Sequence, residues 1–414
     1  MSPPDQPGVR DLLAAPSFAR LWAIGACVNS MRWYDVLVGA LFTLDATGSG
    51  LAVAVVTAAR SAPMLLFGAF AGVICEALNR KRVMVAAHAL AAGSSAAVSL
   101  LALLGWARPW HIALAALVSG TVWSTEMATR RRMVGETVAP RLVPRALALD
   151  TLSGSLSRLA GPVAAGALYE FAGLAAAFAV SCLVFLAAVA LGLGLRHRQE
   201  TRRLALAQVP RDLAEGLAFA RSHTVIAGVL TVTIVMNLLG FPYAALLAPI
   251  GREHFMVAPT LIGVLAAAES FGAFLGGLRL TRGDPPGSGR VLLVGGSLLM
   301  LGCVGLMPLL PWFWPACALL VLGGVGTAAF ANMQSSLLIL HAPAQVRSRA
   351  MGLLTVCIGA GPLGILLLGT LAELLGPMRA IHLAAGTGFV LVLAAGWHWR
   401  RRERAGLAKP GQAL

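Results

Sequence analysis

The chain alternates between long apolar runs and short polar segments that are mostly basic. A window of about 19 residues separates the apolar runs, and each is near the roughly 20 residues that an α-helix needs to cross a bilayer. The pattern therefore predicts an all-α membrane protein with twelve transmembrane helices. The predicted spans cover residues 18–44, 50–74, 83–105, 109–129, 146–169, 172–195, 224–250, 258–278, 290–309, 314–338, 350–372 and 378–398.

The basic residues between these runs fall mainly on one side of the predicted membrane. If the N-terminus is cytoplasmic, the opposite side receives only Arg108, Arg252 and Arg379. An excess of Lys and Arg marks cytoplasmic loops. We therefore expect a bacterial inner (cytoplasmic) membrane protein with both termini in the cytoplasm. The cytoplasmic clusters lie at residues 80–82, 130–145, 196–221, 279–290, 347–349 and 400–409.

The longest polar connection divides the chain into two similar halves. We predict a six-helix bundle over 1–195, a cytoplasmic linker over 196–222, a second six-helix bundle over 223–399 and a basic tail over 400–414. Each half contains an arginine, then a helix, then a Gly-Pro pair, at Gly161-Pro162 and Gly361-Pro362. Paired halves around a central cavity are typical of secondary transporters.

Composition supports the bilayer as solvent and excludes other classes. The sequence is 58% hydrophobic and 12% charged, about half the charged fraction of a soluble domain. The net charge of +15 comes from short clusters between apolar runs, which suits loops near anionic lipid better than a nucleic-acid groove. We expect a monomer in the lipid bilayer with no nucleic-acid partner.

The sequence contains no pattern for a metal, a cofactor or an enzymatic reaction. The eight histidines are scattered, and the six cysteines lie singly inside apolar runs, as small buried hydrophobic residues do. No phosphate-binding loop or nucleophile triad is recognisable. We therefore predict no metal site, no cofactor and no enzyme.

Several motifs resemble those of the major facilitator superfamily. Within that superfamily they are most similar to the branch typified by the enterobactin exporter and macrolide efflux pumps. The resemblance covers about residues 17–395 and implies a twelve-helix transporter. Arg60 and Arg158 match arginines common in this branch, which implies structural roles against a carboxylate or a carbonyl. The motifs are FARLW at 18–22, TGS at 47–49, AARSAP at 58–63, GVICEALNRKRV at 72–83, LVPRALALDTLSGSLSRLAGP at 142–162 and VRSRAMGLL at 346–354.

Two of these motifs imply gating and direction. GVICEALNRKRV resembles the superfamily loop that latches the two halves, with Glu76 in place of the usual aspartate, Arg80 and Arg82 retained, and one arginine lost. Its alternative role is orientation in the membrane. SRLAGPVAAG, with Arg158, Gly161 and Pro162, resembles the antiporter motif of drug exporters. This second motif favours export, and its alternative role is helix packing alone.

Arg32 and Asp35 lie in the middle of the first span and share one helix face. Either charge costs roughly 2.5 to 3.5 kcal/mol to insert. The face continues as Gly25, Asn29 and Gly39, a small or polar stripe that we expect to line the central cavity. We interpret Asp35 as a proton site with Arg32 as its conditional partner, because burial and a nearby arginine shift a carboxylate in opposite directions. The alternative is a permanent ion pair.

Two further acids are candidates for proton coupling. Glu126 lies in the fourth span on the face that carries Ser119, and it precedes Arg130 by four residues. This spacing also suits a plain intrahelical ion pair. Glu269 lies near the middle of the eighth span with no basic residue within a turn. We expect it to be protonated or to meet an arginine from another helix.

The cavity helices of the second half offer polar but uncharged candidates for substrate contact, and apolar ones whose alternative role is packing. The polar candidates are Asn237, Asn332 and Gln334, and the apolar wall candidates are Met236, Phe241, Tyr243 and Met333.

We interpret the protein as a proton-coupled secondary exporter of a small organic molecule, such as a siderophore or an amphiphilic drug. One alternative is an importer of a siderophore or similar solute. The other is a non-transporting membrane receptor or assembly factor on the same fold.

Overall fold

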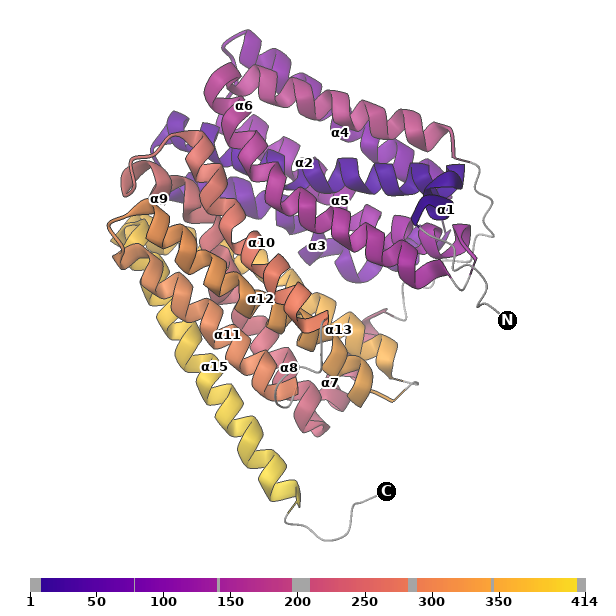
Figure 1. Ribbon diagram of the computed structural model, residues 1–414, viewed down its shortest axis with the longest axis vertical. Helices are drawn as coiled ribbons and strands as arrows, with labels where there is room; N and C mark the ends of the chain where they lie inside the picture. The colour runs from indigo at the N-terminus through magenta and orange to yellow at the C-terminus, as the bar shows by residue number, and fades with distance from the viewer. Residues whose placement is uncertain are drawn as a thin grey trace.

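The computed structural model describes residues 9–77, 79–139, 142–195, 209–281, 289–343 and 346–407, and within these ranges the secondary structure is helical with no strand (Figure 1). The parts of the predicted linker and tail at 196–208 and 408–414 lie outside the described residues, and so does the side chain of Glu76. The helices are α1 Val9–Ala14, α2 Pro16–Thr47, α3 Gly50–Ala77, α4 Arg80–Leu103, α5 Pro109–Thr137, α6 Val143–Leu193, α7 Val209–Ser222, α8 Thr224–Val235, η3 Met236–Gly240, η4 Phe241–Leu246, α9 Leu247–Glu253, α10 Pro259–Thr281, α11 Gly289–Leu306, η5 Met307–Leu309, α12 Phe313–His341, α13 Arg347–Gly359, α14 Gly361–Leu375 and α15 Pro377–Leu407.

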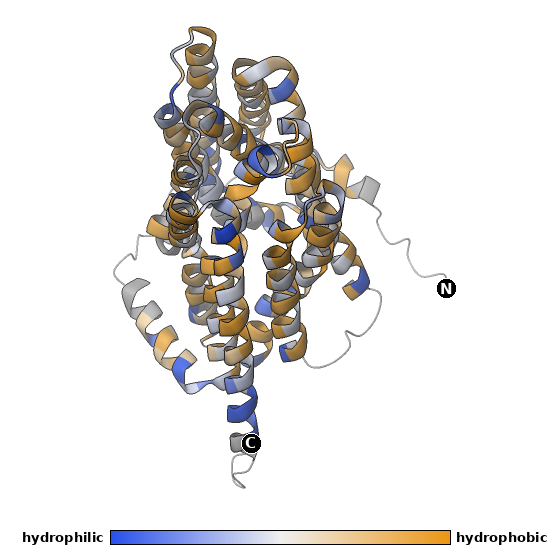
Figure 2. Cartoon of the chain, turned by 90° about the vertical axis from the view of Figure 1, so that its left-hand side faces the viewer, coloured by the Kyte–Doolittle hydropathy of each residue, from blue (hydrophilic) through white to orange (hydrophobic). Residues whose placement is uncertain are grey.

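The apolar runs form helices of membrane-crossing length. Among the described residues, eight helices are long and apolar enough to span a bilayer, and large apolar side chains such as Phe171, Leu340 and Leu374 are exposed on helix surfaces. Figure 2 shows apolar colour along the helices and hydrophilic colour at their ends, most clearly next to the C-terminus. The number of twelve crossings remains a prediction.

Two of the predicted spans share the single helical element α6. The chain reverses between them at Gly173, where φ is 75° and ψ is −176°, a conformation that costs glycine little and other residues much. Pro162 lies inside the first part of α6 without interrupting it. At the matching Gly361-Pro362 pair the helix does break, because α13 ends at Gly359 and α14 begins with the Gly-Pro pair.

The predicted span 224–250 is a broken helix. After α8 the chain makes a π-helical turn over Met236–Gly240 and a 3₁₀ turn over Phe241–Leu246 before α9 begins. Pro242 at the start of the 3₁₀ turn has no N–H to continue the α-helical ladder. Irregular turns of this kind are frequent at functional sites, and this one carries Tyr243.

The buried apolar side chains form two core clusters. One joins residues between Leu12 and Leu195, and the other joins residues between Ala220 and Trp399. We call α1 to α6 the first group and α7 to α15 the second group. Ala248 and Ile262 belong to the second group by sequence but pack in the first core, so the two groups meet in a close apolar contact.

Helices α6 and α10 provide this contact. A Cβ on Gly166 would collide with the carbonyl oxygen of Pro259, and one on Gly263 would collide with that of Pro162. Glycine at these positions lets the two backbones approach each other closely, as small residues do between membrane helices. Helices α3 and α14 make a second contact between the groups.

The groups converge at one end of the molecule and diverge at the other. In Figure 1 their helices meet near α9 and spread apart toward α1, α7 and α13. We call these the α9 end and the α7 end. Polar pairs join the two groups at the α9 end: Arg252 with Asp45 at 3.3 Å, Thr260 donating to Glu170 at 2.6 Å, and Ser49 donating to Glu373 at 3.0 Å.

Gly263→Ala should destabilise the protein, because the added methyl group has no space against the α6 backbone. Overpacking of this kind costs about 1 to 3 kcal/mol in the free energy of unfolding. The matched control is Gly277→Ala on the same helix, where a Cβ meets nothing within 4 Å. Thermal unfolding of the purified protein should show a lower midpoint for the first variant than for the second. Equal midpoints would contradict the close contact.

Candidate functional site

An ion pair between the two groups lies in the middle of the apolar helices. Arg158 Nη2 on α6 lies 3.0 Å from Oε2 of Glu269 on α10, and Tyr243 donates its hydroxyl to the same oxygen at 3.1 Å. Glu269 is buried, with 6% of its surface exposed, and its Oε1 has no hydrogen-bond partner among the described residues. From the sequence we expect Glu269 to be protonated or to meet an arginine from another helix, and Arg158 is that arginine.

The helix contact sets the register of this pair. Helices α6 and α10 run antiparallel, with Gly166 opposite Pro259 and Pro162 opposite Gly263. One further turn along α6 reaches Arg158, and a similar step along α10 leads to the turn that carries Glu269. The Gly-Pro motif therefore positions the ion pair as well as the packing.

Arg32 does not pair with Asp35 in the described part of the chain, so the alternative of a permanent ion pair is wrong, whereas the conditional pairing remains a prediction. The guanidinium carbon of Arg32 lies 3.6 Å from the ring centroid of Trp123 on α5 and 4.8 Å from that of Trp33. Three residues on one helix face leave an angular offset of about 60°, and the two side chains turn toward different neighbours. Arg32 also does not reach Glu126, which has other partners.

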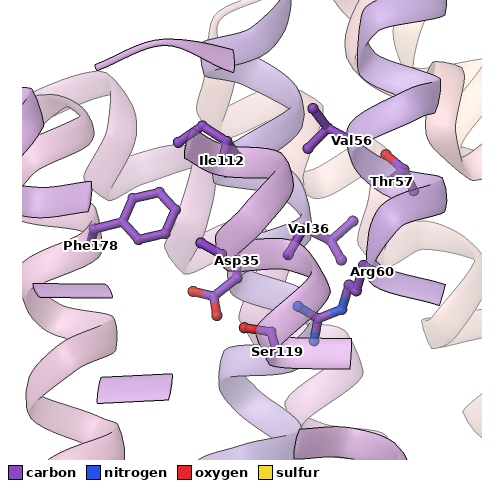
Figure 3. Close-up of a pocket in the computed structure, with 10 residues that line it drawn as sticks. Asp35, Val36, Val56, Thr57, Arg60, Ile112, Ser119 and Phe178 are labelled. Carbon is purple, nitrogen blue, oxygen red and sulfur yellow. The ribbon is translucent and has the colours of Figure 1, made fainter. Parts of the chain in front are cut away.

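Asp35 lines a small pocket inside the first group (Figure 3). The pocket holds about 340 Å³ of empty space, part of it open to solvent, and Phe178 closes one side. Arg60 from α3 and Ser119 from α5 face the same space. Arg60 is a cation whose charge acts on the Asp35 carboxylate. A pocket with a mainly apolar lining thus exists at two predicted residues, Asp35 and Ser119.

The predicted polar stripe on α2 does not line one common cavity. Gly25 packs against the guanidinium of Arg130, and Gly39 packs against Ile112 and Val56, all within the first group. Asn29 is half-buried. The two ends of the stripe are glycines, because helices of the same group pack closely against α2 there. Only the middle of the stripe bears charges.

Glu126 belongs to a buried charge network on α4, α5 and α6. It forms the intrahelical ion pair with Arg130, and His88 Nε2 lies 3.3 Å from Glu126 Oε2. Arg130 also binds both oxygens of Asp150. All four side chains are at most 5% exposed. One arginine is therefore shared by two carboxylates, and Glu126 lies apart from the pocket that contains Ser119.

The basic loop of the signature motif makes contacts within the first group. Arg80 is buried and donates to both oxygens of Glu136 at 2.8 and 2.9 Å. Lys81 donates to the carbonyls of Leu193 and Leu195 at the end of α6. Arg82 is exposed. These contacts tie α4 to its neighbours, whereas a latch to the second group through Glu76 remains a prediction.

The polar candidates in the second group already have partners. The amides of Asn237 and Asn332 donate to backbone carbonyls one turn earlier, at 2.9 Å in each case. Gln334 is buried and donates to the Thr233 hydroxyl at 2.9 Å. Each side-chain amide also carries a second N–H and a carbonyl oxygen, so substrate recognition does not require these bonds to break.

The apolar candidates separate into packing and partly accessible positions. Met236 is fully buried, so it does not line an accessible wall in this conformation. Its place in the π-helical turn directs it into the core. Phe241 is half-buried and contacts Phe330, with ring centroids 5.6 Å apart. Met333 is also half-buried.

Sequence reasoning missed several residues of these clusters. Trp33 and Trp123 bracket Arg32, whereas His88 and Asp150 complete the buried network. The tryptophans carried a usable signal, because they lie inside spans and not at the interfaces where membrane aromatics concentrate. The described residues contain no group of His, Cys, Asp and Glu suited to hold a metal ion.

A family model described as transmembrane secretion effector matches residues 12–409. The chain belongs to this major facilitator family. The multidrug efflux pump Tap of Mycolicibacterium fortuitum is 27% identical over 84% of this chain and 87% of its own length. Macrolide efflux protein A of Streptococcus pyogenes is 23% identical over 87% of this chain and 90% of its own. The family and these relatives are transporters.

The fold is also that of a solved transporter. A bacterial homologue of the human lysosomal transporter Spinster, in an inward-facing and unoccupied conformation, matches with a TM-score of 0.73. The match covers 95% of this chain and 98% of that chain at 13% sequence identity. The chain therefore has the fold of a multi-pass membrane transporter.

Arg130→Met should destabilise the first group strongly, because it leaves Glu126 and Asp150 buried without their cation. Breaking a buried ion pair from one side costs about 3 to 5 kcal/mol. The control is Arg402→Met, at an exposed position of α15. Thermal unfolding or chemical denaturation should separate the two variants clearly. A stability of Arg130→Met equal to that of the control would contradict the shared-arginine network.

Proposed function

We propose that this transporter exports a small organic molecule across the bacterial inner membrane in exchange for protons, by alternating access. The observation that carries the proposal is the Arg158–Glu269 ion pair, because it joins the two groups at the middle of their apolar helices. In this proposal the first group and α8 to α15 are the two halves, residues 1–195 and 223–399. The protein works as a monomer with both termini in the cytoplasm.

The arrangement of the two ends supports an inward-facing state. The groups are bridged at the α9 end by Asp45–Arg252 and by Thr260 with Glu170. The ion pairs Arg80–Glu136 and Arg349–Glu215 lie at the α7 end, each within one group. With the termini inside, the α9 end faces outward. Opening that end requires these outer contacts to break.

Proton coupling follows from the same movement. When the groups rotate, Arg158 and Glu269 separate, because they belong to different groups. A buried carboxylate without its cation is a costly isolated charge, and it binds a proton instead. Return to the inward-facing state restores the ion pair between Arg158 and Glu269, and Glu269 then releases its proton to the cytoplasm. Tyr243 holds the carboxylate in place during this exchange.

Direction and substrate are supported by the relatives and the motif. Two relatives that align over most of their length are efflux pumps for drugs by name, and SRLAGPVAAG resembles the antiporter motif. We propose an amphiphilic drug or a siderophore as the substrate. Asp35, with Arg60 in the same pocket, provides a second carboxylate inside the apolar helices.

Glu269→Gln should abolish coupling because a neutral amide cannot exchange a proton. In proteoliposomes with an imposed pH gradient, the native protein should accelerate movement of a macrolide, ethidium or a catecholate siderophore. We expect Glu269→Gln to reduce the gradient-dependent rate at least tenfold. Glu253→Gln, an exposed acid at the end of α9, should retain it. A full gradient-dependent rate in Glu269→Gln would exclude this coupling site.

Asp45→Asn should favour opening of the α9 end. The Asp45–Arg252 pair is partly exposed, with 38% and 34% of the side chains accessible, so its loss is worth about 1 kcal/mol or less. A change of this size is enough to shift the ratio of molecules with an open α9 end to those with a closed one several-fold. Spin labels at positions 104 and 309, in a cysteine-free background, should report an added population at longer distance. The control variant Glu253→Gln should show no such change, because Glu253 takes no part in the Asp45–Arg252 pair.

A further inference from the structure

Arg32 and Arg158 lie against two tryptophans on α2 and α5, close to where the two groups meet. Arg32 lies over Trp123 and beside Trp33, and the guanidinium carbon of Arg158 lies 4.9 Å from the Trp33 ring centroid. Arg60 and Arg158 are the charged groups that act on Arg32, and both repel it. We call these five residues the arginine–tryptophan cluster. Their helices, α2, α3, α5 and α6, belong to the first group.

The cluster has more positive than negative charge. Glu269 pairs with Arg158, and Asp35 is the carboxylate that acts on Arg60. No carboxylate forms an ion pair with Arg32 in the described ranges, and none of its side-chain nitrogens has a hydrogen bond there. These nitrogens are also absent from the buried polar atoms without partners. Arg32 is therefore stacked on an indole ring, with its N–H donors unused by the described residues.

A stability role does not account for this arrangement. An uncompensated arginine within apolar helices is costly and marks a functional site. Like charges on Arg60 and Arg158 increase that cost. Stacking on Trp123 fixes the plane of the guanidinium while leaving its edge free to donate. The side chain is thus held in a pose suited to receive an acceptor.

The geometry specifies the chemistry of that acceptor. A guanidinium edge binds a carboxylate, sulfonate or phosphate through two parallel hydrogen bonds. Tryptophan faces beside it stack on flat apolar rings. A cationic molecule would meet the charges of Arg32 and Arg158, while the Glu269 carboxylate is already paired with Arg158. The site therefore suits an anionic group attached to an aromatic or apolar body.

We propose that the arginine–tryptophan cluster binds the anionic group of the transported molecule, which is an amphiphilic organic acid. The assignment rests on the proposed transport function and narrows its substrate class. Arg32 is the group that contacts the anion, Arg60 and Arg158 supply the surrounding positive charge, and Trp33 and Trp123 contact the flat body of the molecule. Release of Arg158 from Glu269 strengthens the positive charge at the site.

Equilibrium binding of two dyes of opposite charge tests this assignment. Carboxyfluorescein and rhodamine 6G share a xanthene ring system, but the first is anionic and the second cationic. Fluorescence polarisation is measured with the purified full chain in nanodiscs of zwitterionic phosphatidylcholine. We expect carboxyfluorescein to bind at least tenfold more tightly than rhodamine 6G. Absence of carboxyfluorescein binding, or the reverse order of affinity, overturns the proposal.

Variants identify the residue responsible. Arg32→Gln should weaken carboxyfluorescein binding at least tenfold, and Arg32→Lys should restore part of it, because charge remains but the planar fork is lost. Arg402→Gln, at an exposed position of α15, is the control for total charge and should bind as the native protein does. Unchanged affinity in Arg32→Gln overturns the assignment. Near-native unfolding midpoints for both Arg32 variants exclude misfolding as the cause.

The same experiment separates this site from the transport proposal. Glu269→Gln should keep or increase carboxyfluorescein affinity, because Arg158 loses its charged partner, although gradient-driven transport fails. If the native protein binds the anionic dye through Arg32 but shows no gradient-driven transport, the proposed function is contradicted and the proposed binding site still stands. If the native protein shows gradient-driven transport but no such anion binding, the proposed function still stands and the proposed binding site is overturned.

Discussion

Charged side chains inside apolar helices require polar or oppositely charged partners, and this constraint governs much of the interior of the protein. Glu126, Arg130 and Asp150 satisfy it within the first group, where one arginine serves two carboxylates beside His88. Glu269 satisfies it across the two groups through Arg158. An isolated charge would cost several kcal/mol in such surroundings, so helix positions and charge positions depend on each other.

The two arrangements have different consequences for movement. The network around Arg130 is enclosed by helices that pack on one core, and its side chains are almost fully buried. It therefore stabilises the first group as a unit. The Arg158–Glu269 pair is formed by helices of different groups that contact each other at glycines. A relative rotation of the groups leaves the first network intact and breaks the second pair, which makes that pair suited to a switch.

Irregular backbone supports the same site. The α-helix that begins at Thr224 changes to π-helical and 3₁₀ turns before α9, and this segment brings Tyr243 to Glu269. Broken helices at the middle of the membrane are common in transporters because they leave backbone and side-chain groups near a binding site. This segment therefore lies next to the Arg158–Glu269 pair, and α9, which follows it, carries Arg252 of the contacts that join the two groups.

The sequence by itself determined the helical fold, the apolar surface and the family, because hydropathy and short motifs are local properties of the chain. It also identified Asp35 and Glu269 as charges that need an explanation, and it offered the correct ion pair for Glu126 from a four-residue spacing. Only the tertiary structure decided that Arg32 stacks on Trp123 and that Arg158 pairs with Glu269. Those partners lie on different helices, and their meeting depends on helix rotation and register, which no local pattern specifies. For the same reason the stripe on α2 was misread, since the neighbours of Gly25 and Gly39 come from other helices.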